Sequence, residues 1–201
     1  MTHTLIDLLR HGEPVGGRRY RGQTDDPLSE KGWRQMRAAT AGAQPWTAIV
    51  ASPLMRCRAY AEELAGRTGL PLAFDERLKE VGFGVWEGRT ADEIEVMLPG
   101  AVSAFKRDPV GHRPEGAEAL AGFYERVSAA YEDMVQRHAG GHVLVVAHAG
   151  VIRMAICRVL GLNPGHAYRI QVGSAAMARF QVDERAGSRH EALLYLTPGI
   201  A

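Results

Sequence analysis

This chain of 201 residues contains few cysteines and has almost no net charge. It contains two cysteines, Cys57 and Cys157, which lie far apart and outside any CxxC spacing. Such a pair predicts neither a disulfide framework nor a zinc site. No sign of charge dominates, because 24 basic residues face 23 acidic ones and the formal net charge is +1. The overall charge therefore gives no reason to expect nucleic acid or a membrane as partner, and any basic site must be local.

Long apolar runs and a targeting pattern are also lacking. No apolar segment approaches the roughly 18 residues that a membrane helix needs. Asp7 and Arg10 interrupt the first apolar run, and the N-terminus lacks the charged-then-apolar pattern of a secretory signal. We therefore expect a cytoplasmic protein. The hydrophobic share of 46% and the chain length suit one domain, spanning residues 1–201, with a real core.

Short β-like runs alternate with helical stretches along most of the chain. This alternation predicts an α/β three-layer sandwich, a mostly parallel mixed sheet with helices on both faces. The strands are expected at 4–10, 47–52, 71–78, 142–148, 175–183 and 190–196, the last two as an antiparallel hairpin. The helices are expected from an N-cap at Ser29 to about Ala43, from Pro53 to Gly66 or Gly69, from Gly116 to His138, and from His148 to before Gly161.

The stretch of residues 82–114 fits neither the helix nor the strand period. It contains several prolines and glycines, which interrupt regular structure. We expect an excursion over the edge of the sheet that resembles a lid.

Polar residues stand at the ends of the expected strands. Arg10 and His11 follow the first strand, and His148 ends another before a small-residue turn into a helix. Arg56 falls on the first turn of the helix after the second strand, and Glu80 follows the fourth strand. Each residue alone has an ordinary explanation as a polar edge or surface residue. Because ligands of open α/β sheets bind at the carboxyl ends of the strands, the set together predicts a site.

Phosphoryl transfer is the chemistry that uses this set. Two guanidiniums, Arg10 and Arg56, fork onto phosphate oxygens, and a helix N-terminus adds backbone donors. One histidine attacks phosphorus and forms a covalent phosphohistidine, while a second, if protonated, holds charge on the transferring group. A carboxylic acid protonates the leaving alkoxide and later deprotonates water. This set needs neither a metal nor a cofactor.

Other catalytic patterns are absent. The sequence has no GxxxxGK[ST] phosphate loop, no HExxH metal motif and no GxSxG nucleophile elbow. The CxxxxxR loop of cysteine phosphatases is missing too, because Cys57, between Arg56 and Arg58, is expected in the middle of a helix.

The ordered motifs resemble the histidine phosphatase superfamily, which has the phosphoglycerate-mutase-like fold. The resemblance covers most of residues 4–160 and rests on "LLRHGE", "RGQTDDPLSEKGW", "ASPLMRCRAYAEEL", "LKEVGFGVWEGRT", "GAEAL" and "VVAHAGVIR". It implies that His11 is the nucleophile and Glu80 the acid and base. Arg10 and Arg56 would bind the phosphoryl group, with His148 as its other cationic partner.

Further positions follow from the resemblance. Gln23 and Thr24 match a loop that lines the substrate pocket in relatives, and Glu118 in "GAEAL" has either a helix-start or a pocket-rim role. The chain also departs from the family, since Pro14 and Gly17 stand where many relatives have threonine or serine and asparagine. The anion site is therefore expected to rely more on the arginines and on the Gln23-Thr24 loop.

The resemblance implies a small phosphorylated metabolite as substrate and is closest to the alpha-ribazole phosphatase branch of cobalamin synthesis. A broad sugar-phosphate phosphatase or a phosphoglycerate-type mutase is the alternative. A mutase needs a second anion site, for which Arg18, Arg19 and Arg21 are candidates, although a solvated basic loop is the more usual explanation of such residues. A relative without catalysis that binds a phospho-ligand is a remote alternative, because none of the expected catalytic residues is missing.

Other residues receive ordinary structural interpretations. His112 is a candidate to face the site if the lid closes, Trp86 either braces the Glu80 loop or lies in the core, and the C-terminal hairpin offers an edge for a homodimer. We expect the remaining histidines to be solvent-exposed: His3, His138, His142, His166 and His190.

Overall fold

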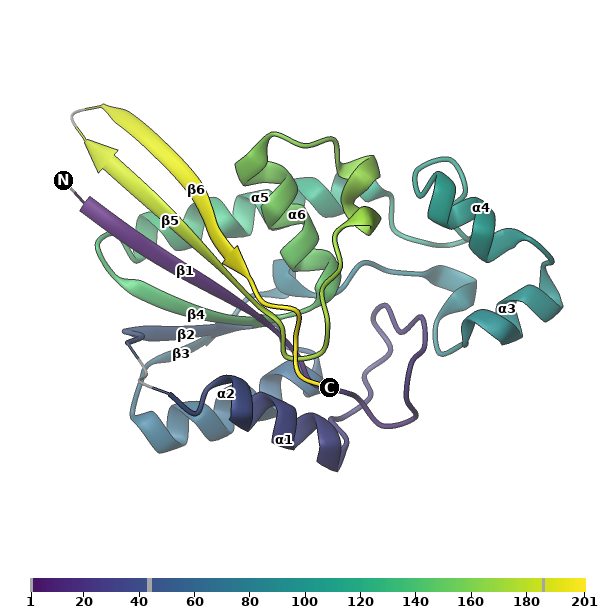
Figure 1. The fold of residues 1–201 in the computed structure, drawn as a ribbon, viewed down its shortest axis with the longest axis horizontal. Helices are drawn as coiled ribbons and strands as arrows, with labels where there is room; N and C mark the ends of the chain where they lie inside the picture. The colour runs from purple at the N-terminus through teal and green to yellow at the C-terminus, as the bar shows by residue number, and fades with distance from the viewer. Residues whose placement is uncertain (1, 43–44, 186) are drawn as a thin grey trace.

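The computed structural model describes residues 2–42, 45–185 and 187–201, and its centre is a six-stranded sheet between layers of helices (Figure 1). The strand order is β3-β2-β4-β1-β5-β6. The first four of these strands run parallel, and β5 and β6 are antiparallel neighbours. The mostly parallel mixed sheet is confirmed. Its strands are β1 Thr2–Arg10, β2 Ala48–Ala51, β3 Leu72–Phe74, β4 His142–Ala147, β5 Met177–Arg185 and β6 Ser188–Leu196.

Helices cover both faces of the sheet, which confirms the three-layer sandwich. In Figure 1, α1 and α2 lie on one face and α5 and α6 on the other. Leu144 and Val146 of β4 belong to the core beside α1 and α2, whereas Val143 and Val145 belong to the core beside α5 and α6. The α-helices are α1 Glu30–Ala39, α2 Met55–Thr68, α3 Ala91–Met97, α4 Ala101–Arg107, α5 Leu120–Arg137 and α6 Ala149–Leu160, and the 3₁₀ turns are η1 Glu76–Leu78, η2 Gly84–Trp86 and η3 Pro164–Arg169.

Capping decides where the first helices begin and end. Ser29 caps α1 as predicted, because its Oγ accepts the Gly32 N–H at 3.0 Å. The predicted end at about Ala43 was too late: the helix stops at Ala39 because Thr40 leaves the helical conformation, and Ala43 itself lies outside the described residues. The second helix ends at Gly69 in a left-handed conformation with φ +72°, which favours glycine.

The segment 82–114 contains two short helices that the sequence did not predict. A capping box of Thr90 and Glu93 starts α3, and α3 and α4 have seven residues each, too few to show a clear apolar period. Phe105 of α4 packs edge-on against Trp86 at 5.5 Å and against Tyr168 at 4.9 Å between ring centroids. The segment 82–114 lies beyond the carboxyl end of β1 (Figure 1), and Trp86 is a buried core residue. The role of this segment as a lid stays a prediction.

A buried charge lies in the middle of the sheet. The Asp7 carboxylate is fully buried and accepts hydrogen bonds from Trp46 at 2.8 Å, from His142 at 2.9 Å and from Arg179 at 2.7 and 2.8 Å. The expectation that His142 is exposed was therefore wrong, because its ring is needed to satisfy Asp7. In the part of the chain that the structure describes, no helix has both the length and the apolar composition to cross a membrane.

Candidate active site

His11 leaves the end of β1 with one ring nitrogen occupied and the other available. Its Nδ1 lies 2.7 Å from the carbonyl oxygen of Gly12. Since a carbonyl only accepts, Nδ1 carries the hydrogen, and Nε2 keeps its lone pair in the neutral ring. The side chain is only 6% exposed. The turn is fixed by Gly12, because a Cβ there would lie 2.2 Å from the Gly32 carbonyl oxygen of α1.

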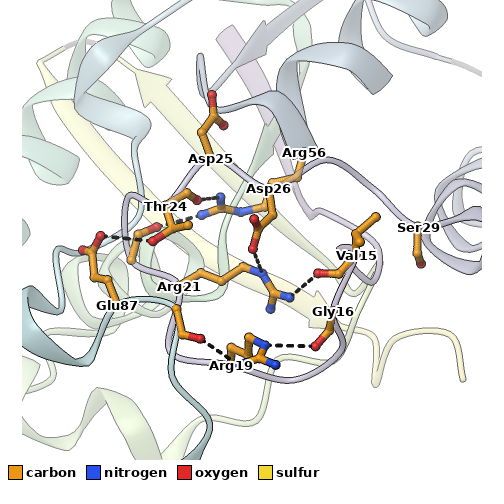
Figure 2. A network of polar contacts seen from close by, with 12 residues as sticks. Val15, Gly16, Arg19, Arg21, Thr24, Asp25, Asp26, Ser29, Arg56 and Glu87 are labelled. Carbon is orange, nitrogen blue, oxygen red and sulfur yellow. Dashed lines mark hydrogen bonds and ion pairs between the residues drawn. The ribbon is translucent and has the colours of Figure 1, made fainter.

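Two guanidiniums, the half-buried one of Arg10 and the buried one of Arg56, belong to the same cluster, and backbone carbonyls hold both of them. Arg10 donates from Nη1 to Val172 at 2.6 Å. Arg56, which is 1% exposed, donates to the carbonyls of Thr24 at 2.7 Å and Gly22 at 2.8 Å (Figure 2). The Nε atoms of both arginines are buried without a partner among the described residues. Unpaired buried donors of this kind are suited to an anionic ligand.

His148 forms the opposite side of the cluster as the N-cap of α6. Its ring is fully buried and lies edge-on to the His11 ring at 5.2 Å between centroids. Its Nε2 lies 2.7 Å from the Oγ of Ser52, a residue at the end of β2 that the sequence did not mark as functional. Burial, with the charge of Arg56 adding to it, holds the pKa of both histidines well below the usual range. In the free site, His148 therefore favours its neutral form rather than the cationic form that the resemblance implies. A bound phosphate would favour the cationic form.

Glu80 meets the cluster at the N-terminus of α6. Its Oε2 accepts the Gly150 N–H at 3.2 Å, and its Oε1 accepts the Val81 N–H at 3.0 Å. A helix N-terminus stabilises a carboxylate. The segment His148-Ala149-Gly150 therefore positions the second histidine and the carboxylate together.

Arg126 of α5 holds the chain that carries Glu80. It donates from Nη1 to the carbonyls of Arg77 at 2.6 Å and Lys79 at 2.7 Å, and from Nη2 to the carbonyl of Glu80 at 3.2 Å. One guanidinium thus binds three carbonyls of the segment 77–80. No sequence pattern marked this residue, because an arginine on a helix is usually a surface residue.

Glu118 completes this support from the other side. Its carboxylate accepts two hydrogen bonds from Arg126, at 2.6 and 2.8 Å, and one from the Gly82 N–H at 3.1 Å. Although burial opposes it, these contacts hold the pKa of Glu118 below its ordinary value. Glu118 does not cap a helix, since the N-cap of α5 is Ala119. It anchors the loop that carries Glu80.

The loop of residues 14–28 brings Gln23 and Thr24 to the edge of the same cluster. Gln23 donates from Nε2 to the carbonyl of Glu80 at 3.4 Å and from its backbone to Glu87 at 3.1 Å. Thr24 donates from Oγ1 to Glu87 at 3.4 Å (Figure 2). Glu87 therefore ties this loop to the segment that follows Glu80.

Two arginines of this loop are structural. Arg21 is 7% exposed and donates to Asp26 at 2.9 Å and to the Val15 carbonyl at 2.7 Å (Figure 2). Arg19 donates to the carbonyls of Gly16 at 3.2 Å and Gly88 at 2.8 Å. A solvated position is therefore wrong for Arg21, which is buried, whereas a second anion site at these arginines stays a prediction. Their contacts are with the protein, while Arg18 is exposed.

Cys57 lies close to His148 without the features of a nucleophile. It occupies the first turn of α2 rather than the middle of a helix, and it is fully buried. Its thiol donates to the Ala147 carbonyl at 3.3 Å. Burial raises the pKa of this thiol far above its usual range. A thiolate at this position is strongly disfavoured.

Comparison with known proteins agrees with this geometry. The family model described as "Histidine phosphatase superfamily (branch 1)" matches residues 6–191. Phosphoserine phosphatase 1 of Hydrogenobacter thermophilus is 30% identical over 89% of this chain and 86% of its own. A probable phosphoglycerate mutase, GpmB, of Shigella boydii is 32% identical over 89% of this chain and 85% of its own. The solved mycobacterial glucosyl-3-phosphoglycerate phosphatase superposes with a TM-score of 0.84 at 29% identity, covering 96% of this chain and 97% of that one.

Proposed function

Because the chain belongs to the histidine phosphatase superfamily, we propose that it hydrolyses phosphomonoesters through a covalent phosphohistidine on His11. One observation carries the proposal. The Nδ1–H of His11 is bound by the Gly12 carbonyl, so that Nε2 keeps a free lone pair, beside two guanidiniums with unpaired buried Nε atoms. A nucleophilic nitrogen and unpaired cationic donors are what a phosphoryl group requires.

The reaction runs in two displacements. In the first, Nε2 of His11 forms a bond to phosphorus, the ester P–O bond breaks, and protonated Glu80 gives its proton to the leaving alkoxide. In the second, Glu80 takes a proton from water, the hydroxide forms a P–O bond, and the P–N bond breaks to release phosphate. Arg10, Arg56 and His148 hold the phosphoryl oxygens in both steps.

The substrate is a small phosphorylated metabolite. The relatives carry names that refer to phosphoserine, phosphoglycerate and glucosyl-3-phosphoglycerate, in which the phosphate esterifies a hydroxyl group of a carboxylic acid. Alpha-ribazole phosphate stays a prediction of the sequence motifs, since the comparisons support a phosphatase or mutase without selecting this substrate. A mutase would keep the phosphoryl group on the protein until a second hydroxyl accepts it, whereas a phosphatase releases it to water.

The test uses p-nitrophenyl phosphate at mildly acidic pH in the presence of EDTA. We expect the wild type to hydrolyse it without added metal and His11→Ala to lose at least about 10³-fold in kcat. His190→Ala is the matched control, because His190 is an exposed residue of β6. Equal hydrolysis by His11→Ala, or no hydrolysis by the wild type, would overturn the mechanism. A panel that includes alpha-ribazole phosphate, phosphoserine and 3-phosphoglycerate then identifies the substrate, and release of free phosphate separates hydrolysis from phosphoryl transfer.

A further inference from the structure

We propose that Arg153, which lies over the ring of Tyr168, binds a carboxylate on the leaving-group part of the substrate and so selects phosphomonoesters of hydroxycarboxylic acids. The inference rests on the proposed phosphatase function and adds a specificity-determining residue to it. Arg153 ends the motif "HAGVIR", and neither Arg153 nor Tyr168 has a role in the two displacements.

The helix α6 directs Arg153 toward Glu80. Gly150, whose N–H binds Glu80, lies three residues before Arg153, and residues three apart share a helix face. The two charges interact: burial lowers the pKa of Arg153, and the Glu80 carboxylate opposes this shift. Glu80 is the group that protonates the leaving oxygen, so that Arg153 lies on the leaving-group side of the site.

One short segment of backbone holds Arg153 beside Arg10. The Nε of Arg153 donates to the carbonyl of Ile170 at 3.0 Å, and Nη1 of Arg10 donates to the carbonyl of Val172 at 2.6 Å. Two residues of chain span at most about 7 Å. The phosphate-binding guanidinium and the second guanidinium are therefore neighbours, at a spacing that suits a small molecule with an anion at each end.

An aromatic ring lies against the second guanidinium. The Cζ of Arg153 lies 5.4 Å from the centroid of the Tyr168 ring, which packs edge-on against Phe105 of α4. The Nε of Arg153 donates to Ile170, and among the described residues its Nη1 and Nη2 have no hydrogen-bond partner. This half-buried fork matches the two oxygens of a carboxylate. Burial raises the pKa of Tyr168 to about 12, so its hydroxyl stays protonated as a further donor.

The experiment compares two ligands that differ in the predicted group alone. 3-Phosphoglycerate carries a carboxylate where glycerol 3-phosphate carries a hydroxymethyl group. Both are titrated by calorimetry into protein with His11→Ala, in which no turnover occurs. We expect at least about tenfold tighter binding of 3-phosphoglycerate, reduced to within about threefold when Arg153→Gln is added. Binding of glycerol 3-phosphate should change by no more than about threefold.

Two further variants complete the design. Arg153→Lys keeps the charge without the planar fork and should give an intermediate preference. Arg169→Gln removes an exposed guanidinium next to Tyr168 in sequence and should leave the preference unchanged. Thermal unfolding of each variant confirms that it is folded.

Two outcomes would overturn the inference. One is equal affinity for the two ligands in the protein with His11→Ala alone. The other is an equal loss of affinity for both ligands when Arg153→Gln is added, because this would show that Arg153 binds the phosphate or supports the fold. Hydrolysis of p-nitrophenyl phosphate by the protein with intact His11, measured in parallel, tests the proposed function separately, because the titrations do not depend on turnover.

Discussion

The carboxylate of Glu80 occupies the space beside Gly150 in which any other residue would place its Cβ. A Cβ at position 150 would lie 2.1 Å from Glu80 Oε1, closer than real Cβ contacts come. The same glycine donates its N–H to Oε2 at 3.2 Å. The start of α6 therefore sets the position of Glu80, the proposed acid and base, and glycine leaves room for its carboxylate because it has no side chain.

Replacing Gly150 by alanine should displace Glu80 and impair proton transfer to the leaving group. We expect kcat to fall by about 10²-fold or more on an alkyl phosphate, whose leaving oxygen needs the proton. The loss should be smaller on p-nitrophenyl phosphate, whose leaving group is stable as an anion. Steady-state kinetics on both substrates measures the difference.

Gly122→Ala is the matched control for this substitution. Gly122 lies inside α5, and a Cβ there meets no atom within 4 Å. Alanine should stabilise that helix by about 0.5–1 kcal/mol and leave both rates unchanged. An equal loss on both substrates in Gly150→Ala would contradict the role assigned to Glu80.

Arg126 should act on the reaction through Glu80, because it holds three carbonyls of the segment 77–80. For Arg126→Met we expect kcat on an alkyl phosphate to fall by about 10–100-fold with little change in KM. Arg126→Lys should recover part of the loss, since an ammonium replaces the charge but cannot reach all three carbonyls. Rates on alkyl and aryl esters, with unfolding in urea beside them, separate positioning from stability.

Arg137→Met controls for the loss of an arginine from the same helix. Its side chain is 74% exposed and lies 3.8 Å from Asp133. We expect no change in either rate. If Arg126→Met were to lose stability alone, with both rates intact, Arg126 would be a structural residue only.

The sequence predicted those parts of the site that follow directly from strand ends. Arg10, His11 and His148 stand next to long apolar runs, and parallel strands bring their carboxyl ends to one edge. Because β4 is buried on both faces, its apolar residues form a continuous run, and such a run can be recognised in the sequence alone. The same reasoning placed the helices that follow β2 and β4.

Tertiary contacts supply the remaining residues, and they leave no local pattern. Ser52, Arg126 and Arg153 contact partners that lie 96, 46 and 17 residues away along the chain. His142 shows the same limit, because only its partner Asp7 explains why the ring is buried. The short helices α3 and α4 depend on caps and on packing around Phe105.

Acid should destabilise the free protein through its two buried histidines. Burial holds the pKa of His11 and His148 well below 6.5, while both titrate near 6.5 when unfolded. Below that pH the unfolded state binds more protons than the folded state, so stability is full above about pH 6.5 and falls as pH decreases. Each histidine contributes a slope of at most about 1.4 kcal/mol per pH unit.

Urea unfolding at about pH 7.5, 6.5 and 5.5 measures this dependence. His148→Gln should reduce the slope, because glutamine does not titrate. His166→Gln, at an exposed position, is the control and should leave it unchanged. An unchanged slope in His148→Gln would mean that His148 is already protonated in the folded protein.

Asp7→Asn should destabilise the fold and spare the chemistry. Although burial opposes it, hydrogen bonds from Arg179 and Trp46 hold the pKa of Asp7 below its ordinary value, and asparagine removes the charge that Arg179 and His142 face. The side chain of Arg179 is 26% exposed and can regain water. We therefore expect the free energy of unfolding, measured in urea, to fall by about 2–3 kcal/mol, toward the low end for a broken buried pair.

Asp183→Asn on β5 is the matched control for this change. Asp183 pairs with His3, whose side chain is 55% exposed, and an exposed pair of this kind contributes little to stability. The Asp7 carboxylate contacts none of the residues around His11, so kcat of folded Asp7→Asn should stay within about twofold of wild type. A large fall in kcat with unchanged stability would contradict this expectation. It would mean that the Asp7 charge contributes to the electrostatics of the site and not only to the stability of the core.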